Sequence, residues 1–583
     1  YYNYCKSRNN VQKLVKLAKQ EYMSGQVELN KNKPKQLWNV LKQLGYSHKL
    51  KQNVSIGISI DNEVISDGVL VANAFNKFYT TVADELVKQL PESANKYNSS
   101  FVKNFYREKG VTENSFSLHA VSQKEITKYV KLLNPKKSTG LDGISSRFLH
   151  DASDAISGKL MYVMNMSINS GQVPDLLKSA KVIPIYKKES KTEVTNYRPV
   201  SILCSISKIL ERIVCDQVED YLIKNRILYE FQSGFRSKFS TATCLTYLND
   251  YVRKEISLGR YVGMVMIDLR KAFDTVNHSI LCDKLHAVGF DNESVSWFKS
   301  YLENRSQLVS VNGASSDLMD ITCGVPQGSI LGPLLFNIYV NDMCSAVNCK
   351  LILYADDSVL LVSHKDFNYV ESTLSSNLQD LSVWLLDNKL SLHLGKTESI
   401  LFGSRKKLKS HKSLNITCNN VNITSTSEVK YLGTFLNQSM DGCNTAKKII
   451  SKCNSRLKFM YRQAKFLSQH AKKTLCNALI MCHLDYCSSS WYNSLDKSMK
   501  HKLQVCQNKV VRFVLNLGNR HHIGPEELCK LDWLDTHHRA MQLQLNLVYE
   551  IFKNNCPEYL KSNFLRIQDV HRYNTRSREC NFF

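Results

Sequence analysis

The chain has 583 residues, of which 43% are hydrophobic, and its 77 Lys and Arg against 52 Asp and Glu give a formal net charge of +25. This length and apolar content allow several subdomains with substantial cores. The charge excess favours a polyanionic partner over a membrane surface, with a basic enzyme that binds no nucleic acid as the alternative. No run of 18 apolar residues predicts a spanning helix.

The N-terminal part of the chain reads as helical and basic. Residues 1–50 carry apolar positions at helical spacing among many lysines, and Gly45 ends the pattern. Residues 90–115 contain Pro, Ser and Gly and predict a loop or domain boundary. A helix is predicted over 122–135, because Ser122 followed by Glu125 forms a capping-box pattern.

Two apolar strand patterns end in carboxylates. The run 262–267 leads into Asp268, and the runs on either side of Asp356 and Asp357 predict two buried strands joined by a tight turn. Adjacent like charges are costly unless a divalent cation neutralises them. If the first strand lies beside the hairpin, Asp268 and Asp356 face one pocket that suits two hard cations and an in-line phosphoryl displacement. The alternatives are a solvated Asp-Asp loop and a strand-end cap at Asp268.

The composition changes after a predicted hairpin at 429–436. No Asp or Glu occurs between Gly442 and Leu484, whereas lysines, arginines and aromatic residues interleave. Ile449, Ile450, Leu457 and Met460 are expected to face inward from a helix whose opposite face tracks a nucleic-acid backbone. The alternative is a solvated helical face. The expected nucleic-acid contacts are Lys447, Lys448, Lys452, Arg456, Lys458, Arg462 and Lys465.

The cysteine and histidine patterns predict no metal site. None of the 18 cysteines forms a C-x-x-C pair, so reduced thiols are expected. The histidines at 521–522 and 537–538 are expected on helices, and a metal site there is the minor alternative. The first residues are polar and basic and do not resemble a signal peptide. An intracellular location follows as the expectation.

An ordered series of motifs gives the chain a resemblance to a known family. The segment 324–342 reads GVPQGSILGPLLFNIYVND and lies between Asp268 and the box formed by Tyr354, Ala355, Asp356 and Asp357. These features resemble the reverse transcriptases of non-LTR (LINE-type) retrotransposons, nearest the jockey- and CR1-like branches. The resemblance covers about residues 118–440, and further segments match in the family's order: 137–144, 180–187, 196–201, 232–236, 388–397 and 429–433.

The resemblance implies a role for each matched residue. Asp268, Asp356 and Asp357 would bind two Mg²⁺ ions, for which Mn²⁺ could substitute. Lys187 and Arg198 would hold the incoming triphosphate, because Lys offers a point charge and Arg a planar fork.

The remaining matched residues would act on the nucleotide. Phe273 would exclude a 2′-hydroxyl, with core packing as its alternative. Gln327 would lie near the nucleotide sugar and the template base, with a loop amide as its alternative. Lys396 would protonate the pyrophosphate, with a plain surface lysine as its alternative.

The implied fold is α+β: a right-hand polymerase with fingers, a palm containing an antiparallel sheet, and a helical thumb. The expected domains are an N-terminal extension (1–110), a family-specific extension (111–179), fingers and palm (180–438), thumb (439–520) and a C-terminal helical segment (521–583). The residues before 110 contain no endonuclease motif and are too few to form an endonuclease domain.

The implied reaction is addition of dNTPs to a DNA primer on an RNA template, in the nucleus and in cytoplasmic ribonucleoprotein. The alternatives within the palm class are an RNA-dependent RNA polymerase and a group II intron maturase. The alternative from another class is a catalytically silent or domesticated RNA-binding derivative.

Overall fold

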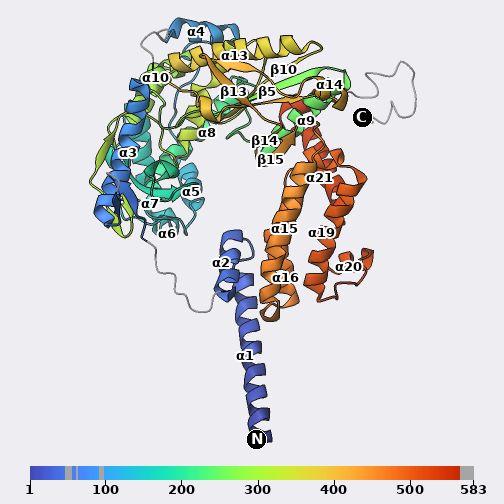
Figure 1. Cartoon of the computed structure of the whole chain (residues 1–583). Coiled ribbons are helices and arrows are strands. Elements are labelled where there is room, and N and C mark those ends of the chain that lie inside the picture. The colour runs from blue at the N-terminus through green and yellow to red at the C-terminus, as the bar shows by residue number, and fades with distance from the viewer. Residues whose placement is uncertain (46–54, 61–62, 91–96, 565–583) are drawn as a thin grey trace, which may run out of the picture.

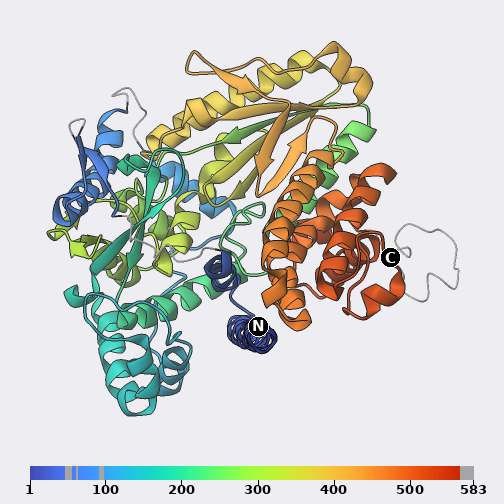
Figure 2. The ribbon, with the colours of Figure 1, turned by 60° about the horizontal axis from the view of Figure 1, so that its bottom comes forward.

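The computed structural model describes residues 1–45, 55–60, 63–90 and 97–564. The described part is a mixed helix-and-sheet protein, which agrees with the α+β expectation. One large sheet lies at the top of Figure 1, with α13 (Phe367–Asp387) across its outer side. A group of helices descends from it on one side, and the second sheet with its own helices lies on the other (Figures 1 and 2).

The larger sheet has six strands and its central pairs are antiparallel. At one edge β13 runs parallel to β11, so the sheet is mixed and the expectation of an antiparallel sheet is wrong there. The segment from β11 to β13 contains a helix and a strand and is long enough for a parallel crossover. In spatial order the strands are β12 (Ile416–Cys418), β13 (Val421–Ser425), β11 (Glu398–Phe402), β5 (Tyr261–Ile267), β10 (Asp357–His364) and β9 (Lys350–Tyr354).

The two faces of this sheet belong to different cores. Val265 and Ile267 of β5 pack in the core that contains the leucines of α13. Val262 and Met264 pack in the core that contains α9 (Thr241–Ser257) and the C-terminal helices. Successive side chains of a strand alternate between the faces, so an apolar run without alternation is what a strand buried on both faces requires.

The second sheet has five strands and contains both pairing types. Its strands β3 and β4 form an antiparallel hairpin, whereas β3 and β6 are parallel. Its strands are β4 (Tyr197–Ile202), β3 (Ser179–Tyr186), β6 (Arg305–Val311), β7 (Ala314–Ser315) and β8 (Met319–Ile321). The helices between and beside the sheets are α5 (Gln123–Lys131), α6 (Ser146–Asp151), α7 (Ser153–Ser170), α8 (Ser205–Lys224), α10 (His278–Ala287), α11 (Asn292–Leu302), α12 (Leu331–Tyr339) and α14 (Arg405–Ser410).

The range 1–110 contributes to two separate parts of the molecule. Helices α1 (Tyr2–Leu29) and α2 (Pro34–Gly45) pack against α15 and α16 of the C-terminal group. After the hairpin of β1 (Ile58–Ile60) and β2 (Glu63–Ile65), α3 (Gly68–Lys88) packs on β6, β7 and β8. The expected helical pattern over 1–50 is confirmed up to Gly45, and residues 46–50 lie outside the described residues.

A helix replaces part of the loop expected over 90–115. Helix α4 (Ser99–Glu108) begins after Asn98, whose side chain accepts a hydrogen bond from the N–H of Phe101 at 3.1 Å. Its Val102 and Tyr106 are buried at a spacing of four, a helical pattern that the neighbouring Ser and Gly residues obscure in the sequence. Residues 91–96 lie outside the described residues. The capping box of α5, formed by Ser122 and Glu125, is confirmed.

The C-terminal part is a bundle of helices. It follows a hairpin of β14 (Glu428–Tyr431) and β15 (Thr434–Asn437), which confirms the hairpin expected at 429–436. The described cysteines are free thiols, and no helix in the described ranges is long and apolar enough to span a membrane. The helices are α15 (Cys443–Gln463), α16 (Gln469–Cys476), α17 (Cys482–Asp485), α18 (Ser488–Trp491), α19 (Lys497–Leu515), α20 (Pro525–Cys529), α21 (Thr536–Phe552) and α22 (Glu558–Lys561).

Candidate active site

A two-residue turn places two carboxylates at one end of the six-stranded sheet. Tyr354 pairs with Asp357 across the β9–β10 hairpin, so Ala355 and Asp356 form the turn. Ala355 has a φ of +58°. This left-handed conformation costs a residue with a Cβ roughly 1–2 kcal/mol and persists only where the surroundings enforce it.

The loop after α8 enforces this conformation. The side-chain Oε1 of Gln232 accepts hydrogen bonds from the N–H of Ala355 at 3.1 Å and from the N–H of Gly234 at 2.9 Å. The N–H of Ser233 donates to the carbonyl of Leu353 at 2.8 Å. A Cβ on Gly234 would lie 2.9 Å from the Cα of Ala355, so the close approach requires glycine at this position.

Asp268 directly follows β5 and lies beside the turn. Ser358 of β10 pairs with Ile267 of β5, so the antiparallel register continues to Asp357 opposite Asp268. Strand alternation directs both side chains to the face that packs on α9 and the C-terminal helices. The structure therefore brings Asp268 together with the Asp356–Asp357 turn, as the sequence pattern predicts.

The electrostatics of Asp357 report this convergence of negative charge. Asp357 is exposed as a residue, but the protein atoms around its carboxyl group partly exclude water from that group. This burial raises the pKa of Asp357. The charges of Asp356 and Asp268 raise that pKa further, whereas Arg198 and Lys187 lower it. Like charges that destabilise one another in this way are a common feature of functional sites.

Three basic side chains face these carboxylates. Lys187 extends the β3–β4 hairpin, where its N–H donates to the carbonyl of Asn196 at 2.9 Å, and Arg198 lies on β4. Burial and the neighbouring charges of Arg198 and Lys396 lower the pKa of Lys187, and Asp268 opposes this shift. The sequence-predicted residues from four separate segments therefore share one site.

None of these charged groups is neutralised by a close partner. Within the described part of the chain, none of Lys187, Arg198, Lys396 and the three aspartates forms an ion pair within 4.0 Å. Exposed Lys and Arg residues facing uncompensated carboxylates can bind an anion on one side and cations on the other.

The carboxylates fit divalent cations by type and backbone position. Their oxygens do not form a closed set: among the described residues, only Cys215, Asp216 and Glu219 bring three possible ligand atoms within 4.8 Å of one another. Repulsion separates uncompensated carboxylates. Side-chain rotation at Asp268, Asp356 and Asp357 is therefore required to bind a cation jointly.

The loop at 324–328 packs tightly beside the site. Gly324 has a φ of +83°, and a Cβ there would lie 2.6 Å from the carbonyl oxygen of Asp274. The carbonyl of Gln327 accepts a hydrogen bond from the N–H of Ser201 at 2.8 Å, and its Nε2 donates to Oδ1 of Asp274 at 2.7 Å. Gln327 is thus held by its own protein at the edge of the site.

Phe273 lies between the core and the site. Its ring stacks on Phe336 of α12, with centroids 4.4 Å apart and planes at 24°, and meets Phe235 edge-on at 6.1 Å. Its carbonyl accepts a hydrogen bond from the N–H of Val325 at 2.9 Å, which ties it to the 324–328 loop. The ring is only partly buried, so the packing fixes its position while one part remains accessible.

Sequence reasoning missed the residues that support the site. Glu211 of α8 is almost fully buried and accepts hydrogen bonds from the N–H of Ile330 at 2.6 Å and the hydroxyl of Tyr301 at 3.1 Å. It thereby fixes the start of α12. The only sequence signal was an acidic residue on an apolar helix. Gln232 lay in a matched segment, but its contact with the turn had no sequence signal.

The basic residues of α15 lie on the face opposite its core. Leu457 and Met460 are buried, and Ile449 and Ile450 are half-buried, which confirms the expected inward face. Arg456 is half-buried and donates to the carbonyl of Leu479. The exposed members of the predicted set are Lys447, Lys448, Lys452, Lys458, Arg462 and Lys465.

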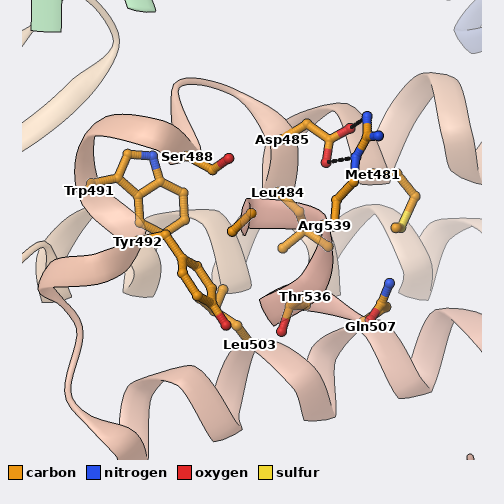
Figure 3. Close-up of a pocket in the computed structure, with 11 residues that line it drawn as sticks. Met481, Leu484, Asp485, Ser488, Trp491, Tyr492, Leu503, Gln507, Thr536 and Arg539 are labelled. Carbon is orange, nitrogen blue, oxygen red and sulfur yellow. Dashed lines mark hydrogen bonds and ion pairs between the residues drawn. The ribbon is translucent and has the colours of Figure 1, made fainter. Parts of the chain in front are cut away.

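Only one of the two C-terminal histidine pairs lies on a helix, and a small pocket lies near that pair. His537 and His538 lie in the first turn of α21, but His521 and His522 precede α20 and are not helical, so the expectation of a helix is wrong for His521 and His522. Figure 3 shows a pocket of about 10 Å³ where Arg539 forms a bidentate pair with Asp485, at 2.8 and 3.1 Å. A space of that size holds no more than one water molecule. Residues 565–583 of the expected C-terminal segment lie outside the described residues.

Comparisons with known proteins agree with this site. Residues 185–436 match the family of reverse transcriptases (RNA-dependent DNA polymerases). The chain is 28% identical over 412 residues to the probable RNA-directed DNA polymerase from transposon BS of Drosophila melanogaster, covering 69% of this chain and 45% of that protein. It is 26% identical over 410 residues to the polymerase from mobile element jockey of the same species, covering 68% and 44%.

A third relative is the probable RNA-directed DNA polymerase from transposon X-element of Drosophila melanogaster, 25% identical over 407 residues, covering 67% of this chain and 43% of that protein. The chain spans less than half the length of these relatives. The matched range includes all three aspartates, Lys187, Arg198, Phe273, Gln327 and Lys396. The chain therefore contains a segment that matches the reverse transcriptase family, and over about two thirds of its length it is similar to the RNA-directed DNA polymerases of transposon BS and mobile element jockey.

Proposed function

We propose that the chain is an RNA-directed DNA polymerase that adds deoxynucleotides to a DNA 3′ end on an RNA template. The observation that carries the proposal is the meeting of Asp268 with the Asp356–Asp357 turn, opposite Lys187 and Arg198. The names of the relatives support the same activity. In this proposal the six-stranded sheet is the palm, the five-stranded sheet belongs to the fingers, and α15 begins the thumb.

Asp268, Asp356 and Asp357 would hold two Mg²⁺ ions, or Mn²⁺ in their place, and such ions would activate the primer 3′-hydroxyl and neutralise charge on the leaving pyrophosphate. Lys187 and Arg198 bind the triphosphate of the incoming nucleotide. Neither forms an ion pair within the described ranges, which leaves their donors free for phosphate oxygens.

The other predicted residues select the nucleotide and complete the transfer. Phe273, fixed by Phe336, places its ring where a 2′-hydroxyl would otherwise fit, so dNTPs are preferred. Gln327, held by Asp274 and Ser201, borders the sugar and the template base. Lys396 lies just after a turn whose backbone is hydrogen-bonded to Asp268 at the end of β5. It donates a proton to the departing pyrophosphate.

Substitution of the turn aspartate tests this proposal. Asp356→Ala removes a metal ligand, and loss of several kcal/mol of charge stabilisation lowers extension by about a thousandfold or more. RNA affinity stays within about twofold, because the basic face of α15 is intact. The measurements are primer extension and RNA binding by the purified chain, with Asp380→Ala on the exposed face of α13 as the matched control. Extension by Asp356→Ala at the control's rate would contradict the site assignment.

A further inference from the structure

A hollow of about 450 Å³ lies between α2 and α15, outside the site that contains the carboxylates. Helix α2 lies beside α15 in Figure 1. The volume of the hollow falls within the range of pockets that accept small organic ligands. The hollow is lined by Trp38, Lys448, Ser451, Lys452, Ser455, Arg456, Phe459 and Arg462.

The N-terminal helices are held in place beside this hollow. Gln20 of α1 donates to the carbonyl of Lys465 at 3.0 Å, and Ser24 and Ser468 hydrogen bond at 2.9 Å. Leu37 and Leu41 of α2 are fully buried in the core of the C-terminal helices. These contacts hold α2 in place, so that Trp38 lies against α15.

The hollow has a strongly positive potential. Its charged lining residues are all Lys or Arg, and none of them has an ion-pair partner among the described residues. Lys448, Lys452 and Arg462 are exposed. Nearby His483 has its pKa lowered to about 4, by burial and then by the charges of Arg456 and Lys452. Such a site favours phosphate over any cationic or neutral ligand.

Two aromatic rings form part of the wall. The rings of Trp38 and Phe459 have centroids 5.2 Å apart and planes tilted by 40°, and both are only partly buried. Arg456 lies 5.7 Å from the ring of Trp38, and Arg462 lies 5.3 Å from the ring of Phe459. Aromatic rings next to phosphate-binding cations are the combination that binds unpaired nucleotides, because every free base has a face that can stack.

We propose that this hollow binds an unpaired nucleotide of single-stranded RNA, with the base against Trp38 and the flanking phosphates on Lys448, Lys452 and Arg462. A duplex is excluded as the ligand of the rings, since its bases are stacked on one another. The exposed hydroxyls of Ser451 and Ser455 offer partners for the ribose 2′-hydroxyl, the group that distinguishes RNA from DNA.

One lining residue of the hollow also contacts the β14–β15 hairpin. Lys448 also lies 5.3 Å from the ring of Phe435 on β15. Tyr431, in the same hairpin, has its pKa raised first by burial, and the nearby charge of Asp357 adds to that shift. Because paired bases cannot stack on the rings, the proposed polymerase activity makes the strand in the hollow RNA outside the primer–template duplex. This part of the inference rests on the proposed function, whereas the binding site itself does not.

Binding of a labelled twelve-nucleotide RNA without secondary structure tests the proposal by anisotropy. Stacking predicts that Trp38→Ala weakens binding by roughly ten- to a hundredfold, whereas Trp38→Phe retains most of the affinity. The double variant Lys452→Gln/Arg462→Gln lowers the salt dependence by about one to two phosphate contacts. Its residues are exposed, so the fold is kept. Lys502→Gln, an exposed lysine of α19 outside the hollow, is the matched control and binds like the wild type.

Three results separate the alternatives. Quenching of tryptophan fluorescence by RNA, absent in Trp38→Phe, supports stacking. Equal affinity for a DNA strand of the same sequence overturns the assignment to RNA, and wild-type affinity of both Trp38→Ala and the double variant overturns the site. The binding assays are repeated in Asp356→Ala: loss of extension with retained RNA binding there shows that the two proposals stand or fall separately.

Discussion

Replacing Gly234 by Ala should disable the turn that holds Asp356 without unfolding the chain. The added Cβ would lie 2.9 Å from both the Cα and the Cβ of Ala355 and closer still to its backbone nitrogen, whereas ordinary contacts begin at 3.4 Å. The turn must therefore move by at least about half an ångström, which is already the tolerance of a catalytic constellation. A displacement of about 1 Å costs on the order of a hundredfold in rate.

We expect Gly234→Ala to lower the extension rate by about ten- to a hundredfold, while RNA affinity changes by less than about twofold. The assay is single-turnover primer extension at saturating dNTP, with anisotropy for RNA binding. Gly518→Ala is the matched control, because a Cβ there meets no atom within 4 Å. If Gly234→Ala extends primers within about threefold of the control, the turn is not under the constraint argued for it.

Three further predictions concern the site and its support. Phe273→Val should raise incorporation of ribonucleotides by about tenfold or more relative to dNTPs, measured by competitive extension; unchanged discrimination would refute the role of the ring. The pKa of Asp357 is raised, so this carboxyl group binds a proton more tightly in the folded state than in the unfolded state. The stability that the protonated group contributes is therefore lost as the pH rises from the ordinary Asp range through the raised pKa. In EDTA at pH 7, Asp357→Asn should therefore melt above the wild type, and Mg²⁺ should raise the Tm of the wild type more; equal Tm values in both conditions would contradict this. Lys284 and Asp342 form a fully buried ion pair at 2.6 Å. Lys284→Met leaves Asp342 without its counter-charge and should reduce the free energy of unfolding, measured in urea, by about 3–5 kcal/mol. A loss below about 1 kcal/mol would refute that value.

The local features of the site could be predicted from the sequence. Asp268 follows a continuous apolar run, and the two runs around Asp356 have the length and composition of strands. These patterns depend on neighbouring residues alone. The pairing of β5 with β10 joins segments that are far apart in the chain, and the structure confirms it.

The packing between distant segments could not be predicted in the same way. The rings of Trp38 and Phe459 are in contact although the two residues are far apart in the sequence. Glu211, buried in a core, accepts a hydrogen bond from the backbone at the start of α12. Neither contact leaves a periodic signal. Helix α4 is hard to predict for a different reason: Ser99 and Gly110 favour a loop, whereas Asn98 caps a helix that begins at Ser99.

The most direct measurement is template-directed extension by the purified chain with Mg²⁺, on an RNA template annealed to a DNA primer. The account predicts products that end at the template's 5′ end with four dNTPs, stop at the first missing base when one dNTP is omitted, and do not form with rNTPs. Failure to extend under any divalent cation, or addition that ignores the template, would contradict the assignment of the carboxylate site to RNA-directed DNA synthesis.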